Sequence, residues 1–599
     1  MIREPRTLND LFLDAVERYA SKRAAVRFKH GEAWHDISHQ ELLQRVQQVS
    51  MALSDLGLGT GDRVAILSEN SPDWAVADFA CLTAGLVDVP IYPTLPATQV
   101  GYILKDSETR AVFVQNAEQL AKIQAVRATL PHLRHVIAFD STLARDDVVS
   151  LTQLMREGAA AEPGHADWRT RARAVTPDAL ATLIYTSGTT GHPKGVMLSH
   201  GNFVSNVIAA LKVLPVGPDD SCLSLLPLSH SFERMGGHYT MFQAGVTIVY
   251  AEHMDRVAAN MIEVRPTVVL AVPRFYEKVY ARVLDNAVSG GALKRRIFYW
   301  AKRQAEAWAD RVLAGEPVPR TLGAAKSVAD ALVFRKLQAR TGGRIRFFVS
   351  GGAPLLPAIG KFFYAAGLPI LEGYGLTETS PVITLNPLDR PRIGSVGPAL
   401  PGVAVRLAED GEILCRGPNV MRGYFKNPDA TREMIDAEGW LHTGDVGEMD
   451  PDGYLRITDR KKDLIVTAGG KNIAPQPIEG RVKTNKFVLN TVMLGDRMPY
   501  PIMLVVPNFD TLGAWARERG LPADPDTLMT QPDARAKIER EVMGALRDLA
   551  SYETPKKVVL IRDDFTIEGG ELTPTLKVKR RVVEQKYEKE IAGAYAESS

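Results

Sequence analysis

Apolar and polar positions near the N-terminus follow a pattern that predicts a strand–helix–strand unit. One apolar run, RVAILS, begins at Arg63, and a second, VDVPIY, begins at Val87. Between them, Ser71 and Pro72 suit the cap and first turn of a helix, and Gly85 suits its end. Short strands on either side of a helix indicate a β-α-β crossover.

The same pattern returns further along the chain. The run ALATLIYTSG at 179–188 is followed by a loop, by a stretch that Ser199 could cap as a helix, and by DSCLSLLPLS at 220–229. Strands that alternate with helices predict a largely parallel, layered α/β body.

From about residue 386 the pattern changes to short apolar runs between Gly, Pro and Asp turn residues, which predicts an antiparallel β lobe at 386–458. The charged stretch DRKKDLI begins at Asp459, and strand and helix patterns are mixed beyond it. We therefore expect an α/β fold with two domains. The N-terminal domain, 1–459, holds layered α/β subdomains and the β lobe, and a smaller, mobile α+β domain spans 460–599.

Residues 285–340 are expected to be helical, with Ile297, Ala301, Trp308 and Val312 on one stripe and many Lys and Arg between them. A pair of helices that covers the core is the favoured interpretation. The basic and aromatic character also leaves a membrane-surface role open.

Composition narrows the class of protein. The chain has 599 residues, 45% hydrophobic and 24% charged, which is typical of a soluble protein with several folding units. Its 72 Lys and Arg against 70 Asp and Glu give a net charge of +2, so we expect no nucleic-acid partner. Three widely spaced cysteines, Cys81, Cys222 and Cys415, argue against a disulfide framework and a cysteine-based zinc site.

The sequence also bears on location. The first twenty residues predict an amphipathic helix rather than a signal peptide, because Asp14, Glu17 and Arg18 interrupt the apolar positions. No apolar run approaches the ~18 residues that would span a bilayer. We expect a cytoplasmic protein, soluble or peripheral at the inner face of a membrane.

One loop concentrates the residue types that bind phosphate. It follows the strand pattern that ends at Tyr185, and its glycines, hydroxyls and Lys194 offer backbone donors, side-chain donors and positive charge. The G-K-[ST] order of a Walker A loop is absent. Taken alone, a loop of this composition is more often a simple turn. The residues assigned to phosphate binding are Thr186, Ser187, Gly188, Thr189, Thr190, Gly191 and Lys194.

The string YTSGTTGHPKG at 185–195 resembles the phosphate-loop signature of the adenylate-forming superfamily: acyl-CoA synthetases, peptide-synthetase adenylation domains and luciferases. The superfamily's other motifs follow in order. They are YGLTETS at 374–380, TGD at 443–445, DRKKD at 459–463 and TPTLKVK at 573–579. The resemblance covers most of the chain and implies ATP, Mg²⁺ and CoA as cofactor and co-substrates.

The implied reaction explains why such a site needs these residues. A carboxylate is a poor electrophile, and transfer of AMP onto it turns its oxygen into a leaving group. Attack of that anion on the α-phosphorus of ATP requires positive charge and a metal ion. By resemblance, Lys577 supplies the charge and Thr377 contacts the α-phosphate. His230 positions the carboxylate, and Glu378 with Thr186 holds Mg²⁺.

The resemblance assigns the remaining site residues to the nucleoside, the acyl chain and CoA. Asp445 accepts hydrogen bonds from the ribose, and Arg460 reaches the same nucleotide. Without the resemblance, Asp445 reads as a turn residue and Arg460 as a surface charge. Other assignments are adenine for Tyr374, cofactor binding for Gly375, and the acyl chain beside the nucleotide for Gly352 and Ala353. Lys462 is assigned as a domain pivot, and Gly469, Gly470 and Lys471 to the pantetheine channel.

Within the superfamily the chain most resembles long-chain fatty acyl-CoA synthetases, through PLSHSFER, VPRFYEKVY, the helical insertion before SGGAPL, and ELTPTLKVKRR. We expect ATP-dependent activation of a long-chain fatty acid through acyl-AMP, followed by transfer to CoA. The alternatives are a fatty acyl-AMP ligase that delivers to a carrier protein, a non-catalytic lipid- or nucleotide-binding relative, and a generic ATPase. Chain-length preference, oligomeric state (a homodimer is one option) and transient membrane contact stay open.

Overall fold

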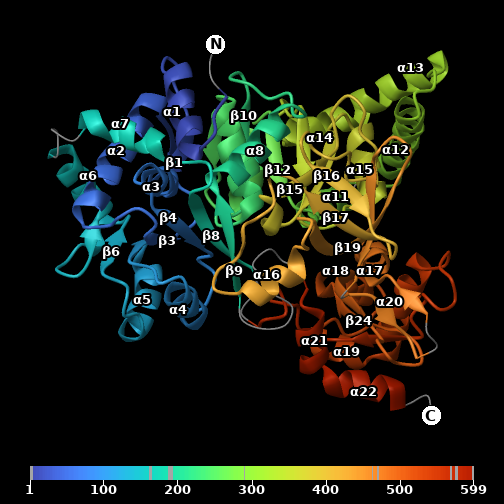
Figure 1. The fold of residues 1–599 in the computed structure, drawn as a ribbon. Coiled ribbons are helices and arrows are strands. Elements are labelled where there is room, and N and C mark those ends of the chain that lie inside the picture. The colour runs from blue at the N-terminus through green and yellow to red at the C-terminus, as the bar shows by residue number, and fades with distance from the viewer. Residues whose placement is uncertain are drawn as a thin grey trace.

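Two large sheets organise the first part of the chain (Figure 1). The computed structural model describes residues 4–160, 165–186, 193–288, 291–461, 463–468, 471–566, 569–573 and 578–596. The first sheet has the strand order β18 (Gly423–Tyr424), β9 (Lys194–Ser199), β8 (Leu180–Thr186), β4 (Val87–Ile91), β3 (Arg63–Leu67), β5 (Ala111–Val114), β6 (His135–Ala138) and β7 (Val149–Ser150).

The second sheet has a parallel centre and antiparallel edges. Its order is β15 (Val382–Leu385), β14 (Ile370–Gly375), β13 (Phe347–Ser350), β12 (Val268–Ala271), β10 (Ser221–Ser224), β11 (Thr247–Tyr250), β1 (Val26–His30) and β2 (Ala33–Ile37).

One large apolar core joins the faces of the two sheets through helices between them. These are α1 (Leu8–Arg18), α2 (His39–Asp55), α3 (Pro72–Thr83), α8 (His200–Leu211) and the π-helix η4 (Glu233–Thr240). The outer faces carry α4 (Ala97–Asp106) and α5 (Ala117–Val126) on the first sheet, and α11 (Pro273–Val288) and α15 (Pro357–Ala365) on the second.

The first predicted crossover is confirmed. β3 and β4 pair in parallel with Arg63 opposite Val87, and α3 connects them. The Ser71 side chain accepts a hydrogen bond from the Trp74 N–H, Pro72 begins the helix, and Gly85 follows it with φ +74°. A side chain is disfavoured at that φ, which explains the glycine.

The second predicted crossover is wrong. β8 and β10 belong to different sheets, because the segment KGVMLS forms the additional strand β9, which pairs antiparallel with β8. Ser199 caps α8 as expected. However, α8 leads from one sheet to the other, where its apolar side chains join the common core. The phosphate-loop sequence therefore connects two antiparallel strands rather than a strand and a helix.

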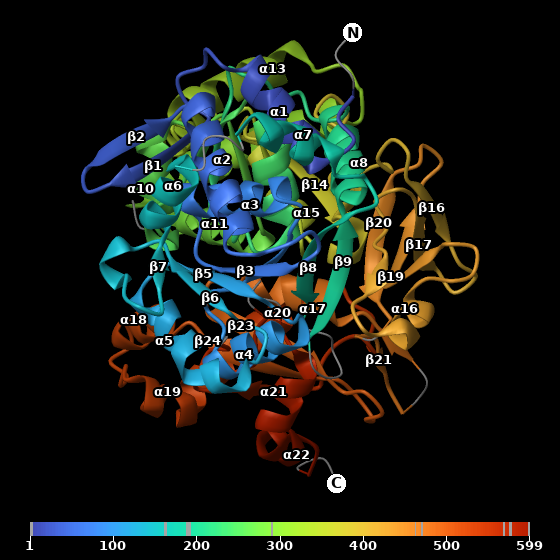
Figure 2. The ribbon, with the colours of Figure 1, turned by 60° about the vertical axis from the view of Figure 1, so that its left-hand side comes forward.

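The β lobe and the C-terminal elements have their own sheets. β16 (Ala404–Leu407), β17 (Glu412–Arg416), β19 (Leu441–Met449) and β20 (Leu455–Arg460) form an antiparallel sheet, as the turn-rich pattern predicts. Beyond it, β21 (Ile465–Val466) pairs with β22 (Asn472–Ile473). β23 (Val488–Leu494), β24 (Ile502–Pro507) and β25 (Lys557–Leu560) carry α17 (Pro475–Lys483), α18 (Phe509–Arg517), α19 (Pro525–Thr530), α20 (Pro532–Ala545), α21 (Arg580–Lys586) and α22 (Glu588–Ala596) (Figure 2).

The helical character of 285–340 is confirmed, but the predicted stripe is wrong in detail. The segment forms α12 (Gly291–Leu313), α13 (Arg320–Ala329), η6 (Asp330–Phe334) and α14 (Arg335–Arg340). The buried face of α12 consists of Phe298, Ala301, Ala305 and Ala309, while Ile297, Trp308 and Val312 are half-buried. Small residues allow close packing against α13 and α15, and the larger side chains lie at the margins. In the described residues, no helix is both long and apolar enough to cross a bilayer.

Candidate active site

Three predicted residues meet at the boundary between the second sheet and the β lobe. Tyr374, at the end of β14, donates a hydrogen bond from Oη to Asp445 Oδ2 at 2.7 Å. Arg460 donates from Nε to Asp445 Oδ1 at 2.8 Å. The β19–β20 ladder places Asp445 opposite Arg460, so strand register fixes this pair. Tyr374 and Arg460, which lie 71 and 15 positions from Asp445 in the sequence, thus converge on its carboxylate, as the nucleoside assignment requires.

Burial and neighbouring charge shift the pKa values of two residues in this cluster. The pKa of the Tyr374 phenol lies well above its usual value because the ring is buried and Asp445 lies beside it. The neighbouring Asp445 carboxylate also raises the pKa of Arg460 against the effect of burial. Tyr374 is therefore a neutral donor and Arg460 a fixed cation. The Arg460 side chain keeps 33% of its surface exposed, which leaves it accessible to a ligand.

The structure describes both ends of the phosphate loop. Thr186 and Lys194 face each other as the last pair of the β8–β9 hairpin. The predicted residues Ser187, Gly188, Thr189, Thr190 and Gly191 lie outside the described residues. The Lys194 Nζ atom lies 5.0 Å from the centre of the Tyr424 ring, a cation–π distance that holds the lysine at the base of the hairpin.

Tyr424 also connects this hairpin to Glu378. It lies on β18, which extends the sheet beyond β9 with Tyr424 opposite Val196. Its Oη donates to Glu378 Oε1 at 2.8 Å. In the part of the chain that the structure describes, Glu378 Oε2 makes no hydrogen bond. Sequence reasoning missed Tyr424, because a tyrosine in a two-residue strand has no pattern that marks it as a site residue.

The predicted acyl-site residues also come together. The Ser231 hydroxyl lies 3.2 Å from the Thr377 hydroxyl, which brings the His230 segment against the second signature motif. His230 Nδ1 accepts a hydrogen bond from the Phe232 N–H at 3.1 Å, which orients the imidazole ring. A Cβ built on Gly351 would lie 3.2 Å from the Phe232 ring, which explains a glycine there.

The glycines of the motifs at 350–355 and 374–380 differ in how much space surrounds them. Gly352 has φ +83° and Ala353 is exposed, so this turn is open to a ligand. By contrast, a Cβ on Gly375 would lie 1.7 Å from the Pro381 carbonyl oxygen. Gly375 is required by the close approach of β14 to the following segment. Its predicted contact with the nucleotide remains a prediction.

The C-terminal site residues are only partly described. Lys577, Lys462, Gly469 and Gly470 lie outside the described residues. Lys471 is described, and its backbone N–H donates to the Thr467 hydroxyl at 3.2 Å between β21 and β22.

The segment that carries Lys577 is fixed at its described flanks. Leu572 and Val578 form an antiparallel bridge, and the Lys579 N–H donates to the Glu571 carbonyl at 2.7 Å. Arg580 donates from Nη1 to Glu479 Oε1 at 2.7 Å and to the Met493 carbonyl at 3.0 Å. The two described flanks are thus bridged to each other, and Arg580 ties the second flank to α17 and β23.

A buried ionic network behind the His230 segment was not predicted. Arg234, in η4, is fully buried and bonds Asp88 of β4, Asp78 of α3 and the Tyr239 hydroxyl. It also donates to the Thr182 hydroxyl of β8 at 2.9 Å. The network fixes the helix after His230 to the first sheet. The string SFER gives no signal that its arginine is a core residue.

The chain matches the model of the AMP-binding enzyme family over residues 12–425. It belongs to this family. The model of the AMP-binding enzyme C-terminal domain matches residues 462–599. The predicted superfamily is therefore confirmed.

Relatives of this AMP-binding enzyme cover most of its length. It is similar to a long-chain-fatty-acid–CoA ligase of Mycobacterium bovis, with 38% identity over 566 residues, 94% of this chain and 92% of that protein. A peroxisomal long chain acyl-CoA synthetase of Arabidopsis thaliana is 33% identical over 99% of this chain and 86% of its own length.

Solved structures agree with the fold. ATP-bound MatB from Rhodopseudomonas palustris matches with a TM-score of 0.68 and 26% identity, over 97% of this chain and 99% of that chain. The anthranilate CoA ligase AuaEII in complex with anthranoyl-AMP has a TM-score of 0.74 at 20% identity, with 98% of each chain covered, and shows the same fold. The predicted fold class is confirmed.

Proposed function

We propose that this AMP-binding enzyme is a long-chain fatty acid–CoA ligase. The fatty acid carboxylate bonds to the α-phosphorus of ATP and diphosphate leaves. The CoA sulfur then bonds to the acyl carbon and AMP leaves. The observation that carries the proposal is the convergence of the Asp445 cluster and the Glu378 cluster on one short segment, 374–378, in a chain whose relatives are named for this activity.

The nucleotide would lie between these two clusters. In this proposal Asp445 accepts from the ribose hydroxyls, and Arg460 holds that carboxylate while reaching the same nucleotide. Tyr374 flanks the adenine. Thr377 and the hydroxyls and backbone of the phosphate loop donate to the phosphates, and Lys194 and Lys577 offset their negative charge.

Glu378 fits the requirements of a magnesium contact. It is buried, one oxygen is oriented by Tyr424, and the other makes no hydrogen bond among the described residues. The described residues contain no group of three or more His, Cys, Asp or Glu that could hold a metal by themselves. Mg²⁺ typically uses one or two carboxylates together with phosphate oxygens, so Glu378 and Thr186 with the triphosphate suffice. When bound, the ion would neutralise charge at the phosphates.

Two half-reactions would share this site. His230, oriented by the bond from the Phe232 N–H to its Nδ1, positions the acid beside Gly352 and Ala353. Lys577 acts in the first step and then leaves to admit CoA. A rotation about Lys462 would bring Lys471 and the adjacent glycines to the pantetheine channel.

The test is isotope exchange followed by product analysis. With oleate, Mg²⁺ and ATP, we expect labelled diphosphate to exchange into ATP only when the fatty acid is present. Adding CoA should convert the acid to oleoyl-CoA. Absence of exchange would contradict acid activation, and acyl-AMP that accumulates in the presence of CoA would favour the acyl-AMP ligase alternative.

A further inference from the structure

Positive charge is concentrated in one helical region of the chain. Residues 291–346 contain 13 Lys and Arg but four Asp and Glu, a formal charge of +9. The rest of the chain has 59 Lys and Arg and 66 Asp and Glu, or −7. Both views place α13, which belongs to this region, on the rim of the molecule at the opposite end from α22 (Figures 1 and 2).

The same region exposes large apolar side chains. Leu293 and Tyr299 on α12 are 72% and 48% exposed, and Val328 on α13 and Leu332 on η6 are 49% and 47% exposed. These are four of the ten exposed large hydrophobic residues in the described part of the chain. The half-buried Trp300 lies beside Tyr299. Four of these ten side chains therefore lie within a stretch of forty residues.

Ring contacts place two of these side chains, Tyr299 and Leu332, at one end of the helical pair. Phe298 of α12 and Phe334 of η6 both contact Phe362 of α15, with ring centres 6.4 and 6.0 Å apart. The start of α12 therefore lies beside η6. Tyr299 and Leu332, which lie close in sequence to these two phenylalanines, belong to the same end.

The four acidic residues of this region already form ion pairs, so its remaining Lys and Arg side chains are available to bind an anionic partner. Glu306 pairs with Lys302, Asp330 with Lys326, Glu316 with Arg311 and Asp310 with Lys361. No acidic partner is found among the described residues for the exposed cations Lys294, Arg295, Arg296, Arg303, Arg335, Lys336 and Arg340.

We propose that this insertion surface, the exposed side chains of residues 291–340, docks onto an anionic phospholipid bilayer. Amphipathic surfaces bind at the headgroup region when apolar side chains enter the acyl boundary while Lys and Arg pair with lipid phosphates. Tyrosine and tryptophan suit that boundary, because each has an apolar ring and a polar group. The proposal goes beyond the catalytic function, and vesicle binding itself is measured without ATP, fatty acid or CoA.

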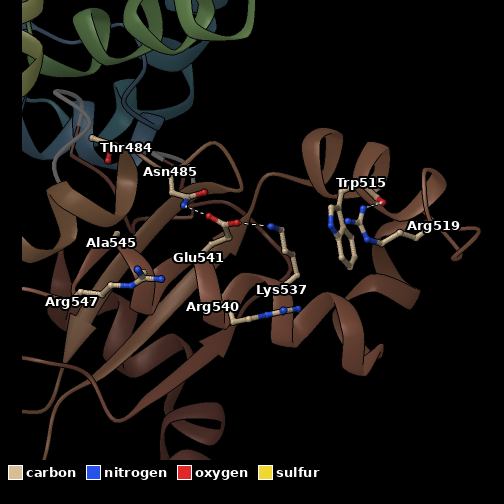
Figure 3. Close-up of a pocket in the computed structure, with 10 residues that line it drawn as sticks. Thr484, Asn485, Trp515, Arg519, Lys537, Arg540, Glu541, Ala545 and Arg547 are labelled. Carbon is tan, nitrogen blue, oxygen red and sulfur yellow. Dashed lines mark hydrogen bonds and ion pairs between the residues drawn. The ribbon is translucent and has the colours of Figure 1, made fainter. Parts of the chain in front are cut away.

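A second basic region provides the matched comparison. A pocket of about 720 Å³ between α17, α18 and α20 is lined by Arg519, Lys537, Arg540 and Arg547 (Figure 3). Lys537 is paired with Glu541, and the one large apolar side chain among the lining residues, Trp515, is half-buried beneath Arg519. This pocket has charge without exposed apolar groups, so we expect it to contribute little to bilayer binding.

The experiment is sedimentation of the full chain with vesicles. We expect binding to mixed phosphatidylglycerol–phosphatidylcholine vesicles, weakened by salt, and little binding to phosphatidylcholine alone. Because each Lys or Arg near an anionic surface contributes about fivefold, Arg295→Ala/Arg296→Ala should reduce the partition coefficient about 30-fold. Leu293→Ser/Leu332→Ser should reduce it about tenfold or more. Arg540→Ala/Arg547→Ala should bind like the parent.

Fatty-acid-dependent diphosphate exchange and circular dichroism would show that each variant is folded. Equal binding to neutral vesicles, or a loss in the pocket variant instead of the insertion variants, would overturn the proposal. The proposal would also be overturned if Leu293→Ser/Leu332→Ser kept full vesicle binding and a DNA duplex competed with that binding. That result would identify a surface for nucleic acid.

Discussion

At the level of single residues, η4 contains two adjacent buried ionisable residues with opposite surroundings. Arg234 is surrounded by Asp78, Asp88 and Tyr239. Glu233 is also fully buried, and neither carboxyl oxygen makes a hydrogen bond of normal geometry among the described residues, although the nearby Ser224 hydroxyl partly offsets the effect of burial on its pKa. An ionised carboxylate without partners is costly to bury, so a neutral acid is the favoured form. Accordingly, burial raises the pKa of Glu233 from 4.5 to about 8.

This shift makes the stability depend on pH. The folded protein keeps a proton on Glu233 that the unfolded chain loses above its ordinary pKa, so the contribution is fully present below pH 4.5 and is lost as the pH rises through about 8. Glu233→Gln keeps the shape and removes the titration. The advantage of this variant over the parent in unfolding free energy should therefore grow by roughly 3 to 4 kcal/mol from pH 5 to pH 8, measured by urea denaturation at both pH values.

The control for this titration is Glu539→Gln, because Glu539 is exposed on α20. Its unfolding free energy should differ from that of the parent by the same small amount at both pH values. Parallel pH profiles for Glu233→Gln and the parent would show that Glu233 is ionised in the folded state.

Sequence reasoning identified the charged and hydroxyl residues of the candidate site because they belong to ordered motifs. Asp445 and Arg460 are fifteen residues apart, and their pairing follows from the hairpin that the turn-rich pattern predicts. Tyr424 and Arg234 could not be found in this way. Their partners, Glu378 and Asp88, lie 46 and 146 residues away, and only the packing of the two sheets brings them together.

At the level of elements, the segment that carries Lys577 depends on anchors outside it. Arg580 begins α21 three residues after Lys577, and its guanidinium bonds the buried Glu479 of α17 and the Met493 carbonyl of β23. The Glu479 carboxylate also accepts from the Met493 N–H at 2.7 Å. Arg580 would therefore act as a positioning residue for Lys577, since small displacements of a reacting group reduce rates strongly.

We expect Arg580→Ala to lower fatty-acid-dependent diphosphate exchange by about tenfold to a hundredfold. Thioester formation from supplied acyl-AMP should change little, because in the proposed mechanism Lys577 acts only in the first step. The matched control is Arg581→Ala, since Arg581 is exposed at the next position. Equal loss of both steps in a folded Arg580→Ala variant would contradict a positioning role and indicate a general defect of the C-terminal domain.

Elements were predicted best where local signals and tertiary packing agree. The β3-α3-β4 unit has a cap, a first-turn proline and a terminal glycine, and it formed as expected. In contrast, nothing in the sequence KGVMLS shows whether it forms a strand or part of a loop. Its pairing with β8 depends on the neighbouring sheet. The buried face of α12 differs from the predicted stripe because alanines fit the narrow space against α15.

At the level of the whole molecule, the candidate site draws on both parts of the chain. Asp445, Glu378 and His230 come from the part before Asp459, and Lys577 comes from the part after it, so in the proposed mechanism their relative placement would control the reaction. Arg274 of α11 donates from Nη2 to the Leu489 carbonyl of β23 at 3.0 Å, across the two parts. Nearby, burial lowers the pKa of Lys483, while Glu277 of α11 opposes that shift.

We propose that the Arg274 contact holds the C-terminal domain in the orientation seen here. A rotation at 459–463 has to break it, and one hydrogen bond to a charged donor contributes about 1.5 kcal/mol or more. In Arg274→Ala the rotated states should therefore be about tenfold more populated, and trypsin should cleave the basic junction faster by a similar factor. Arg282→Ala is the control, because Arg282 is exposed on the same helix. Unchanged cleavage in Arg274→Ala would mean that other contacts set the orientation, and faster cleavage in both variants would indicate a loosened α11.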